Sequence, residues 1–274
     1  MEYVKKAIEK ARNDRGKRAL EGSSEMDAMA SSPASDSLND DDAINIDYSE
    51  TRSVSLNRHA LIENRVIAAF DSDERAEPYR QLRTQVLKKL RDNSWRTLAI
   101  TSAQQGAGKT LTAVNLAIAL AKEVNQTVLL VDMDFKNPSI LDVLGLEAEA
   151  GLMEYLSSEN ISIQDILINP GLDRLTILPT LPVKGITSEI LSSPGMKSLL
   201  DEIVNRYSDR FVIFDLPPLL RDDDALAFLP YADACLLIVE DCVTTPDDLE
   251  RCGHLLEGTN ILGTVFNKAR VRTA

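Results

Sequence analysis

The stretch Thr97–Thr110, TLAITSAQQGAGKT, places the strongest constraint on the fold of this 274-residue chain. An apolar run from Leu98 to Ile100 predicts a short β-strand, and the apolar residues after Thr110 predict a helix. The turn between them has the spacing of a phosphate-binding P-loop, with alanine in place of the first glycine. Glycines let backbone N–H groups approach phosphate oxygens, and the positive end of the helix dipole faces the same anion. The stretch therefore predicts a strand–loop–helix unit that holds a phosphate group.

Length and charge narrow the class of protein. The chain can hold one α/β domain of about 200 residues with a smaller unit beside it. Its net charge of −13 argues against binding nucleic acid through the phosphates. Three cysteines without metal-ligand spacing suit a reducing compartment. Because no apolar run approaches about 18 residues, we expect a cytoplasmic protein without membrane spans of its own.

The N-terminal part differs in composition from the rest. Residues 1–20 predict a short amphipathic helix whose polar face is basic, with seven Lys or Arg residues against three Asp or Glu. This helix either docks to a partner or to an anionic membrane surface, or it is a frayed terminus in solvent. Residues 21–70 are expected to be an acidic, mostly disordered linker, since residues 21–52 hold nine acidic residues and one arginine. Apolar residues return between 54 and 70, which indicates a strand or a segment that docks on the main domain.

Residues 71–274 are predicted to form the main domain. A helix over 74–92 precedes the P-loop, and later helices are expected near 151–155, 196–207, 224–229 and 246–256. Strands are expected at 127–131, 175–178, 211–214, 234–239 and 261–266. Continuous apolar strands that alternate with helices predict a P-loop NTPase of the α/β class, with a mostly parallel central sheet and helices on both faces.

Acidic residues after two other strands predict the metal ion that a P-loop nucleotide needs. Asp215 follows the apolar run FVIF and is expected at the carboxyl end of its strand, which is the Walker B pattern for holding Mg²⁺. Asp132 and Asp134 follow the run LLV, so one carboxylate could serve the metal ion while the other accepts a proton from an attacking hydroxyl group or water. The alternative for this pair is that it only caps the turn into the next helix. Lys136 could contact a phosphate or an acidic partner.

These patterns predict the site residue by residue. Lys109 is expected to reach the β- and γ-phosphates, and the Thr110 hydroxyl to bind Mg²⁺. The expected catalytic residues are Lys109, Asp132, Asp134 and Asp215, with Asp132 as the base. The expected metal ligands are Thr110, Asp134 and Asp215. The expected ATP contacts are Ala103, Gln104, Gln105, Gly106, Ala107, Gly108, Lys109, Thr110 and Leu111.

The three motifs together resemble the bacterial tyrosine kinases of capsule and exopolysaccharide assembly, which share the fold of the Min and Par partition ATPases. The resemblance rests on Gly106–Thr110, on Asp132, Asp134 and Pro138, and on Asp215–Pro218, and it covers roughly residues 72–270. It implies that Asn267 lies near the adenine of ATP and that Glu77, Arg80 and Arg83 (an ExxRxxR spacing) make contacts between subunits of a ring. It also implies a membrane adaptor of the chain-length-regulator type, which would recruit the protein to the inner membrane. Ile8–Arg15 is similar to the N-terminus of the kinases at exosortase-linked loci.

Departures from the family pattern leave the phosphate acceptor open. Gln104 replaces the lysine of the partition ATPases and favours the kinase branch, whereas Lys136 replaces the arginine usual in the kinases. The sequence carries no tyrosine after Tyr231, where such kinases have a cluster that is phosphorylated. Three alternatives stay open: the tail has been lost or truncated, the acceptor is Tyr3, Tyr48 or another protein, or the site only binds and hydrolyses ATP. We expect a Mg·ATP-dependent tyrosine kinase or ATPase; the alternatives are a Min/Par-type positioning ATPase and a non-catalytic, ATP-gated scaffold.

Overall fold

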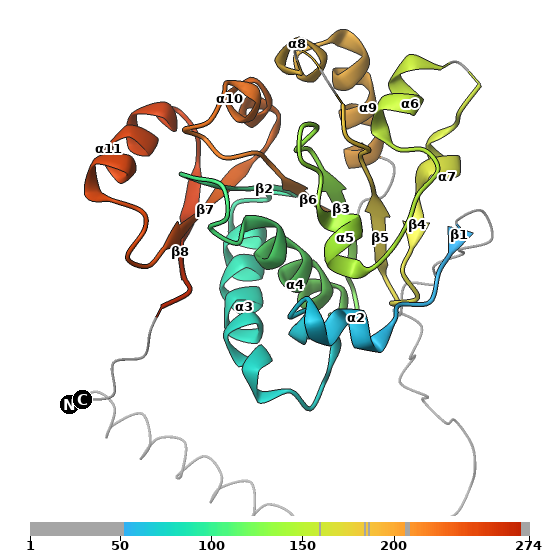
Figure 1. Ribbon diagram of the computed structural model, residues 1–274, viewed down its shortest axis with the longest axis horizontal. Helices are drawn as coiled ribbons and strands as arrows, with labels where there is room; N and C mark the ends of the chain where they lie inside the picture. The colour runs from blue at the N-terminus through green and yellow to red at the C-terminus, as the bar shows by residue number, and fades with distance from the viewer. Residues whose placement is uncertain (1–51, 159, 184, 186, 206–208, 270–274) are drawn as a thin grey trace, which may run out of the picture. The chain divides into compact units, whose positions relative to one another are not determined.

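The computed structural model describes residues 52–158, 160–183, 185, 187–205 and 209–269. In these residues one sheet has the strand order β1-β4-β5-β3-β6-β2-β7-β8 (Figure 1). The strands are β1 Arg52–Ser53, β2 Thr97–Ser102, β3 Thr127–Asp132, β4 Ile168–Asn169, β5 Leu175–Leu178, β6 Arg210–Asp215, β7 Ala234–Glu240 and β8 Ile261–Asn267. In the described part of the chain, β4 and β5 pair antiparallel and all other neighbouring strands pair parallel.

Helices cover both faces of the sheet. On one face lie α2 Arg58–Glu63, η1 Ile67–Ala69, α3 Glu77–Asp92, α4 Lys109–Ala121 and α5 Ile140–Leu144. On the other face lie α6 Leu152–Ser157, α7 Ile163–Ile166, α8 Ser188–Leu191, α9 Pro194–Asn205, α10 Asp224–Phe228, η3 Leu229–Tyr231 and α11 Pro246–Leu255. The short helix η2, Glu74–Ala76, leads into α3. The α/β fold predicted from the alternating pattern is confirmed.

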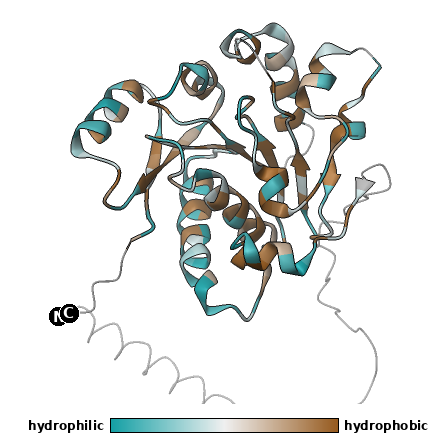
Figure 2. Ribbon diagram, viewed as in Figure 1, coloured by the Kyte–Doolittle hydropathy of each residue, from teal (hydrophilic) through white to brown (hydrophobic). Residues whose placement is uncertain are grey.

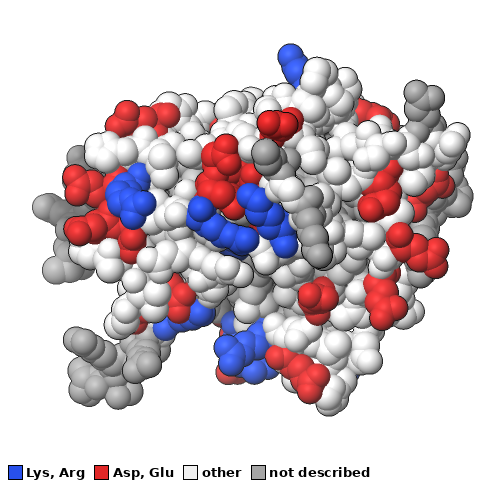
Figure 3. Space-filling model, turned by 45° about the horizontal axis from the view of Figure 1, so that its top comes forward, with Lys and Arg blue, Asp and Glu red and all other residues white. Residues whose placement is uncertain are grey.

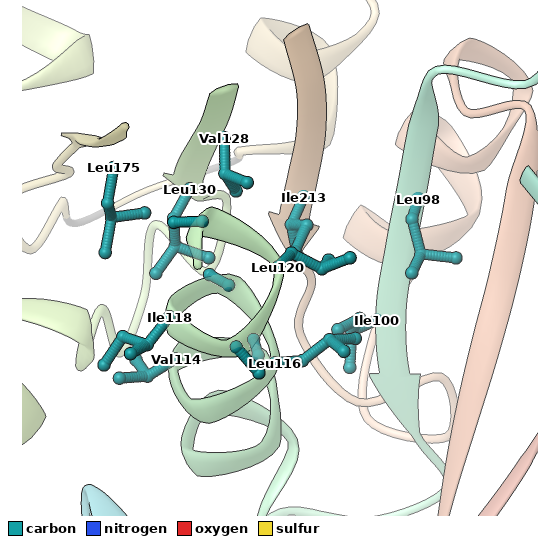
Figure 4. Close-up of a cluster of buried hydrophobic side chains, with 14 of the residues drawn as sticks. Leu98, Ile100, Val114, Leu116, Ile118, Leu120, Val128, Leu130, Leu175 and Ile213 are labelled. Carbon is teal, nitrogen blue, oxygen red and sulfur yellow. The ribbon is translucent and has the colours of Figure 1, made fainter. Parts of the chain in front are cut away.

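Alternate residues of each central strand point to opposite faces of the sheet, where they belong to two separate hydrophobic cores. In β3, Leu130 packs toward α4 while Leu129 points into the core beneath α9. Helix α4 has apolar residues all around, and Figure 4 shows Leu116 and Leu120 beside the strands. In Figure 2 the hydrophobic strands are brown, and the helices that cover them carry teal, hydrophilic residues on their outer sides. Strands that are buried on both faces need continuous apolar runs, which explains why the sequence shows runs and no alternation.

The central strands match their predicted positions closely. The predicted strand 175–178 is β5 with the same bounds, and the others differ by one or two residues at an end. The helix expected over 196–207 is α9, which begins two residues earlier, at Pro194, because proline is well suited to a first turn. The elements β1, β4, α2, α5, α7 and α8 were not predicted; each has six residues or fewer, too short to show a clear periodicity.

The predicted boundary between linker and domain needs a correction. Residues 52–70, assigned to the linker, pack against the domain, and Val66 is fully buried. Asn115 of α4, also fully buried, explains the attachment: its side-chain oxygen accepts from the Ala68 N–H at 2.9 Å, and its amide donates to the Arg65 carbonyl at 3.3 Å. The folded part therefore begins ahead of residue 71.

The predictions for the N-terminal helix over residues 1–20, for the acidic linker up to residue 51, and for Tyr3 and Tyr48 lie outside the described residues. Among the described residues, no helix has both the length and the hydropathy that a membrane crossing requires.

Candidate functional site

The P-loop lies where the sequence predicted it, between β2 and α4 at the carboxyl edge of the sheet. Gly106 and Gly108 have φ angles of +86° and +91°, which side-chain-bearing residues rarely adopt. Gly108 is the N-cap of α4, and no side chain caps the first amides of the helix. A helix start without a side-chain cap, behind a glycine turn, is a ready anion site.

The loop is held from outside by residues on β8 and α11. The Asn267 side-chain amide donates to the Ala107 carbonyl at 2.8 Å. Lys268 donates to the Gly106 carbonyl at 2.8 Å and is paired with Glu240 at the same distance. Gln104 donates to Asp248 on α11 at 2.9 Å. These contacts leave the loop conformation set before any ligand arrives, which reduces the entropy that binding must overcome.

A buried charge cluster stands directly behind the loop. Lys109 Nζ lies 3.1 Å from Asp134 Oδ2 and 3.8 Å from Asp215 Oδ1. The Thr110 hydroxyl donates to Asp215 Oδ2 at 2.6 Å. The structure thus brings together four of the residues predicted for the phosphate and metal site: Lys109, Thr110, Asp134 and Asp215.

Burial and mutual charge shift the pKa values in this cluster. Burial works to lower the pKa of Lys109, but the charges of Asp215 and Asp134 outweigh it and the net pKa is raised. Burial raises the pKa of Asp215, with Lys109 and the Thr110 hydrogen bond opposing it. Burial, with the negative charge of Asp215 beside it, raises the pKa of Asp132 to about 8. The cluster holds more negative charge than Lys109 neutralises, so a further cation is favoured there.

Asp132 lies beside the cluster but is engaged as a cap. Its Oδ2 accepts from the backbone N–H groups of Ser139 and Ile140, at 2.9 and 3.0 Å, where α5 begins. Its Oδ1 accepts from the Asp134 N–H at 3.2 Å. The capping role that the sequence left as an alternative is therefore present, and Asp132 fixes both the start of α5 and the turn that carries Asp134.

The donor set fits a magnesium ion that is shared with phosphate oxygens. Asp215 Oδ1 is buried and has no hydrogen-bond partner, so an oxygen ligand stands ready beside the Thr110 hydroxyl. Ser139, which the sequence reading missed, donates to the Thr110 oxygen at 3.1 Å. Within the described part of the chain, no three His, Cys, Asp or Glu side chains form a metal-binding group of their own. Mg²⁺ commonly takes one or two carboxylates together with phosphate and water oxygens, which suits this set.

A groove of about 440 Å³ opens beside Asn267, between α3, the first turn of α4 and the edge strand β8. Tyr79, Leu82 and Thr112 line it, together with Phe266, whose surface is 61% exposed. Leu111, an expected ATP contact, is partly buried in the first turn of α4, directly after Thr110. The groove has the size and the mixed lining of a small-molecule site.

The residues predicted for subunit contacts pair within the chain. Arg80 donates to Glu77 at 2.8 Å, and Arg83 lies 3.1 Å from Glu123. Both arginines remain partly exposed, so these pairs do not exclude a second partner. On the face that Figure 3 shows, lysine and arginine side chains are scattered among acidic ones and form no continuous basic surface.

Comparison with known proteins finds one matching family model and relatives of similar sequence. Residues 95–245 match a family model described as an AAA domain. The tyrosine-protein kinase YwqD of Bacillus subtilis is 30% identical over 214 residues, which is 77% of this chain and 89% of that protein. The succinoglycan biosynthesis transport protein ExoP of Rhizobium meliloti is also 30% identical, over 75% of this chain but 26% of its own length.

Solved structures with a similar fold are also found. The chimerical protein CapA2B2 superposes with a TM-score of 0.69 at 27% identity, over 80% of this chain and 93% of that one. The septum site-determining protein MinD of Pyrococcus horikoshii, complexed with Mg-ADP, gives a TM-score of 0.52 at 23% identity, over 62% of this chain and 69% of that one. This second likeness concerns the fold alone.

Proposed function

Because the chain belongs to the bacterial tyrosine-protein kinase family with a P-loop ATPase domain, we propose that it is a Mg·ATP-dependent protein-tyrosine kinase of exopolysaccharide or capsule synthesis. The observation that carries the proposal is the convergence of Lys109 and Thr110 with Asp134 and Asp215 behind a preformed anion loop. Phosphoryl transfer depends mainly on positioning and charge neutralisation, which this arrangement supplies.

Each residue of the site has a proposed role in holding the Mg·ATP. The loop amides and Lys109 hold the β- and γ-phosphates, while Thr110, Asp134 and Asp215 hold the magnesium ion. Bound Mg²⁺ supplies charge neutralisation on the phosphate oxygens. The adenine is proposed to lie by Asn267, at the end of the 440 Å³ groove that borders the first turn of α4.

Asp132 is proposed as the base that takes the proton of the acceptor hydroxyl group, although in the nucleotide-free chain its oxygens accept backbone hydrogen bonds. The raised pKa of Asp132, about 8, makes its ionised carboxylate a stronger base than that of an ordinary aspartate. The acceptor itself is proposed to be Tyr3, Tyr48 or a tyrosine of another protein.

Partners are proposed from the family. Relatives named as a tyrosine-protein kinase and as a succinoglycan biosynthesis transport protein support a membrane adaptor of the chain-length-regulator type as the partner of this chain. The protein would then be cytoplasmic and recruited to the inner membrane. Self-association into a ring through Glu77, Arg80 and Arg83 is proposed as well. Sedimentation of the wild type and of an Arg80→Ala, Arg83→Ala variant tests the ring, which the double variant should dissociate; a wild type that stays monomeric with Mg·ATP contradicts it.

Phosphotyrosine detection tests the kinase activity itself. Purified protein incubated with Mg·ATP, with and without the adaptor's cytoplasmic tail, should gain phosphotyrosine that mass spectrometry assigns to Tyr3, Tyr48 or the tail. The same experiment with Lys109→Met supplies the control. ATP binding without phosphotyrosine in either setting would overturn the kinase assignment and favour the ATP-gated scaffold. ATP-dependent dimers that retain DNA would favour the positioning ATPase.

A further inference from the structure

Lys136 forms an ion-pair cluster at the edge of the proposed phosphate site. Its Nζ lies 2.9 Å from Asp222 Oδ2 and 2.8 Å from Asp224 Oδ2. Lys136 comes from the loop between β3 and α5, whereas Asp222 lies just before α10 and Asp224 is its first residue. The side chains are 26%, 18% and 2% exposed for Lys136, Asp222 and Asp224, so the pair with Asp224 is largely removed from water. We call these three residues the Lys136 latch.

Asp224 depends on this lysine. Its Oδ2 also accepts from the Thr187 hydroxyl at the N-cap of α8, while its Oδ1 is buried without a hydrogen-bond partner. Removing the cation would leave a buried carboxylate uncompensated, which is strongly unfavourable. Lys136 is therefore held on Asp224 and is not available to reach a phosphate oxygen. Of the two roles that the sequence left open for Lys136, the structure favours the acidic partner.

The latch acts on the loop that carries Asp134. Lys136 is two residues after Asp134, whose carboxylate lies 3.1 Å from Lys109 Nζ. Between them, Phe135 is fully buried and its carbonyl accepts from the Val183 N–H at 2.9 Å. A loop that is held at Phe135 and Lys136, directly after Asp134, cannot shift without moving that carboxylate away from the P-loop.

We propose that Lys136, by bridging Asp222 and Asp224, is a positioning residue that holds Asp134 in place for the magnesium ion of the bound nucleotide. This rests on the proposed function, since it assumes that Asp134 serves a Mg·nucleotide. Arginine, with its planar fork of donors, can also bridge two carboxylates, so Lys136→Arg should preserve the latch.

The test compares the affinity of full-length protein for a fluorescent ADP with and without Mg²⁺. Wild type should bind more tightly with Mg²⁺, and Lys136→Met should lose about 10- to 100-fold of that gain, the usual cost of removing an outer-sphere partner of a metal ligand. Affinity without Mg²⁺ should stay unchanged. Lys136→Arg should keep the gain. Lys122→Met is the matched control, because Lys122 pairs with Asp71, a carboxylate that is 91% exposed.

A double variant separates positioning from simple stability. In Lys136→Met with Asp224→Asn, no buried charge is left unpaired, so the melting temperature should recover toward wild type. The Mg²⁺-dependent gain should not recover, because the loop has lost its tether. If the double variant recovers both the melting temperature and the Mg²⁺-dependent gain in ADP affinity, the proposal is overturned. A Lys136→Met variant that keeps the full Mg²⁺-dependent gain in affinity would overturn it as well.

Two further outcomes are defined. If Lys136→Met does not fold, the double variant Lys136→Met with Asp224→Asn carries the test, since it removes the tether and leaves no buried charge unpaired; a Mg²⁺-dependent gain in affinity equal to that of the wild type there overturns the latch. A wild type that binds ADP with no gain from Mg²⁺ overturns the proposed function itself. A gain in the wild type that every latch variant retains overturns the latch alone.

Discussion

The two glycines of the P-loop provide a matched pair for testing the loop geometry. Gly106 and Gly108 have nearly the same φ, so alanine at either position should cost about 1–2 kcal/mol of backbone strain. Their surroundings differ. A Cβ at Gly106 meets nothing within 4 Å, whereas a Cβ at Gly108 would lie 2.2 Å from Asn267 Nδ2. Asn267 must then move away and release the backbone carbonyl of Ala107, a residue that is 1% exposed.

Losing that hydrogen bond and leaving a buried carbonyl unpaired should add about 1–3 kcal/mol. We therefore expect Gly106→Ala to lower the free energy of unfolding by about 1–2 kcal/mol, and Gly108→Ala by about 2–5 kcal/mol. Urea unfolding of the nucleotide-free protein measures both, followed by the fluorescence of Trp95, the single tryptophan of the chain. Placing each substitution in an Asn267→Ala background completes a double-mutant cycle. The Gly108 cost should fall there to the Gly106 value. Equal costs in the wild-type background, or no coupling to Asn267, would refute the reasoning.

Two other predictions concern buried polar groups. Asn115→Ala should lower the free energy of unfolding by about 2–4 kcal/mol, because it leaves the Ala68 amide without its acceptor, whereas Asn93→Ala on the surface should cost less than about 1 kcal/mol in the same urea experiment. An Asn115 cost no larger than that of Asn93 would contradict the buried attachment of residues 52–70. Without nucleotide, Asp132 has its pKa raised from 3.8 to about 8, so the folded chain keeps a proton that the unfolded chain releases between those values, and the contribution of Asp132 to stability should fall as pH rises from 4 to 8. The free energy of unfolding is measured against pH in the wild type and in Asp132→Asn. The two slopes should differ by up to about 1.4 kcal/mol per pH unit, with the wild type more negative, and equal slopes would show that Asp132 does not titrate in this range.

Local patterns made the central part of the fold predictable. The P-loop combines a strand, a glycine turn and a helix within 14 residues, and the strand ends at Asp132 and Asp215 follow from apolar runs that stop at an acid. Parallel pairing then places both acids at the same edge, and the structure pairs them across β3 and β6.

What the sequence did not show depends on contacts between distant residues. The bonds of Asn115 to Arg65 and Ala68 join positions about 50 residues apart, and no periodicity marks them. The partners of Lys136 lie 86 and 88 residues further along, and ion pairs carry no sequence pattern. Ser139 has one local signal, since serine directly before an apolar stretch is a common helix N-cap, and Ser139 does stand at the N-cap of α5. Its hydroxyl makes no capping hydrogen bond and donates to Thr110 instead, which no sequence pattern marks.

Transfer of the γ-phosphate of ATP to tyrosine is the central claim, and one measurement addresses it directly. Wild type and Lys109→Met are incubated with Mg·ATP labelled in the γ-phosphate, and the label on tyrosine is quantified over time. Lys109 is buried against Asp134 and Asp215, so its removal deprives the phosphates of a cation that is fixed in place. We expect label on tyrosine in the wild type and a rate lower by about 100-fold or more in the variant. Equal labelling of the two proteins, or a wild type that binds Mg·ATP and never labels tyrosine, would contradict the account.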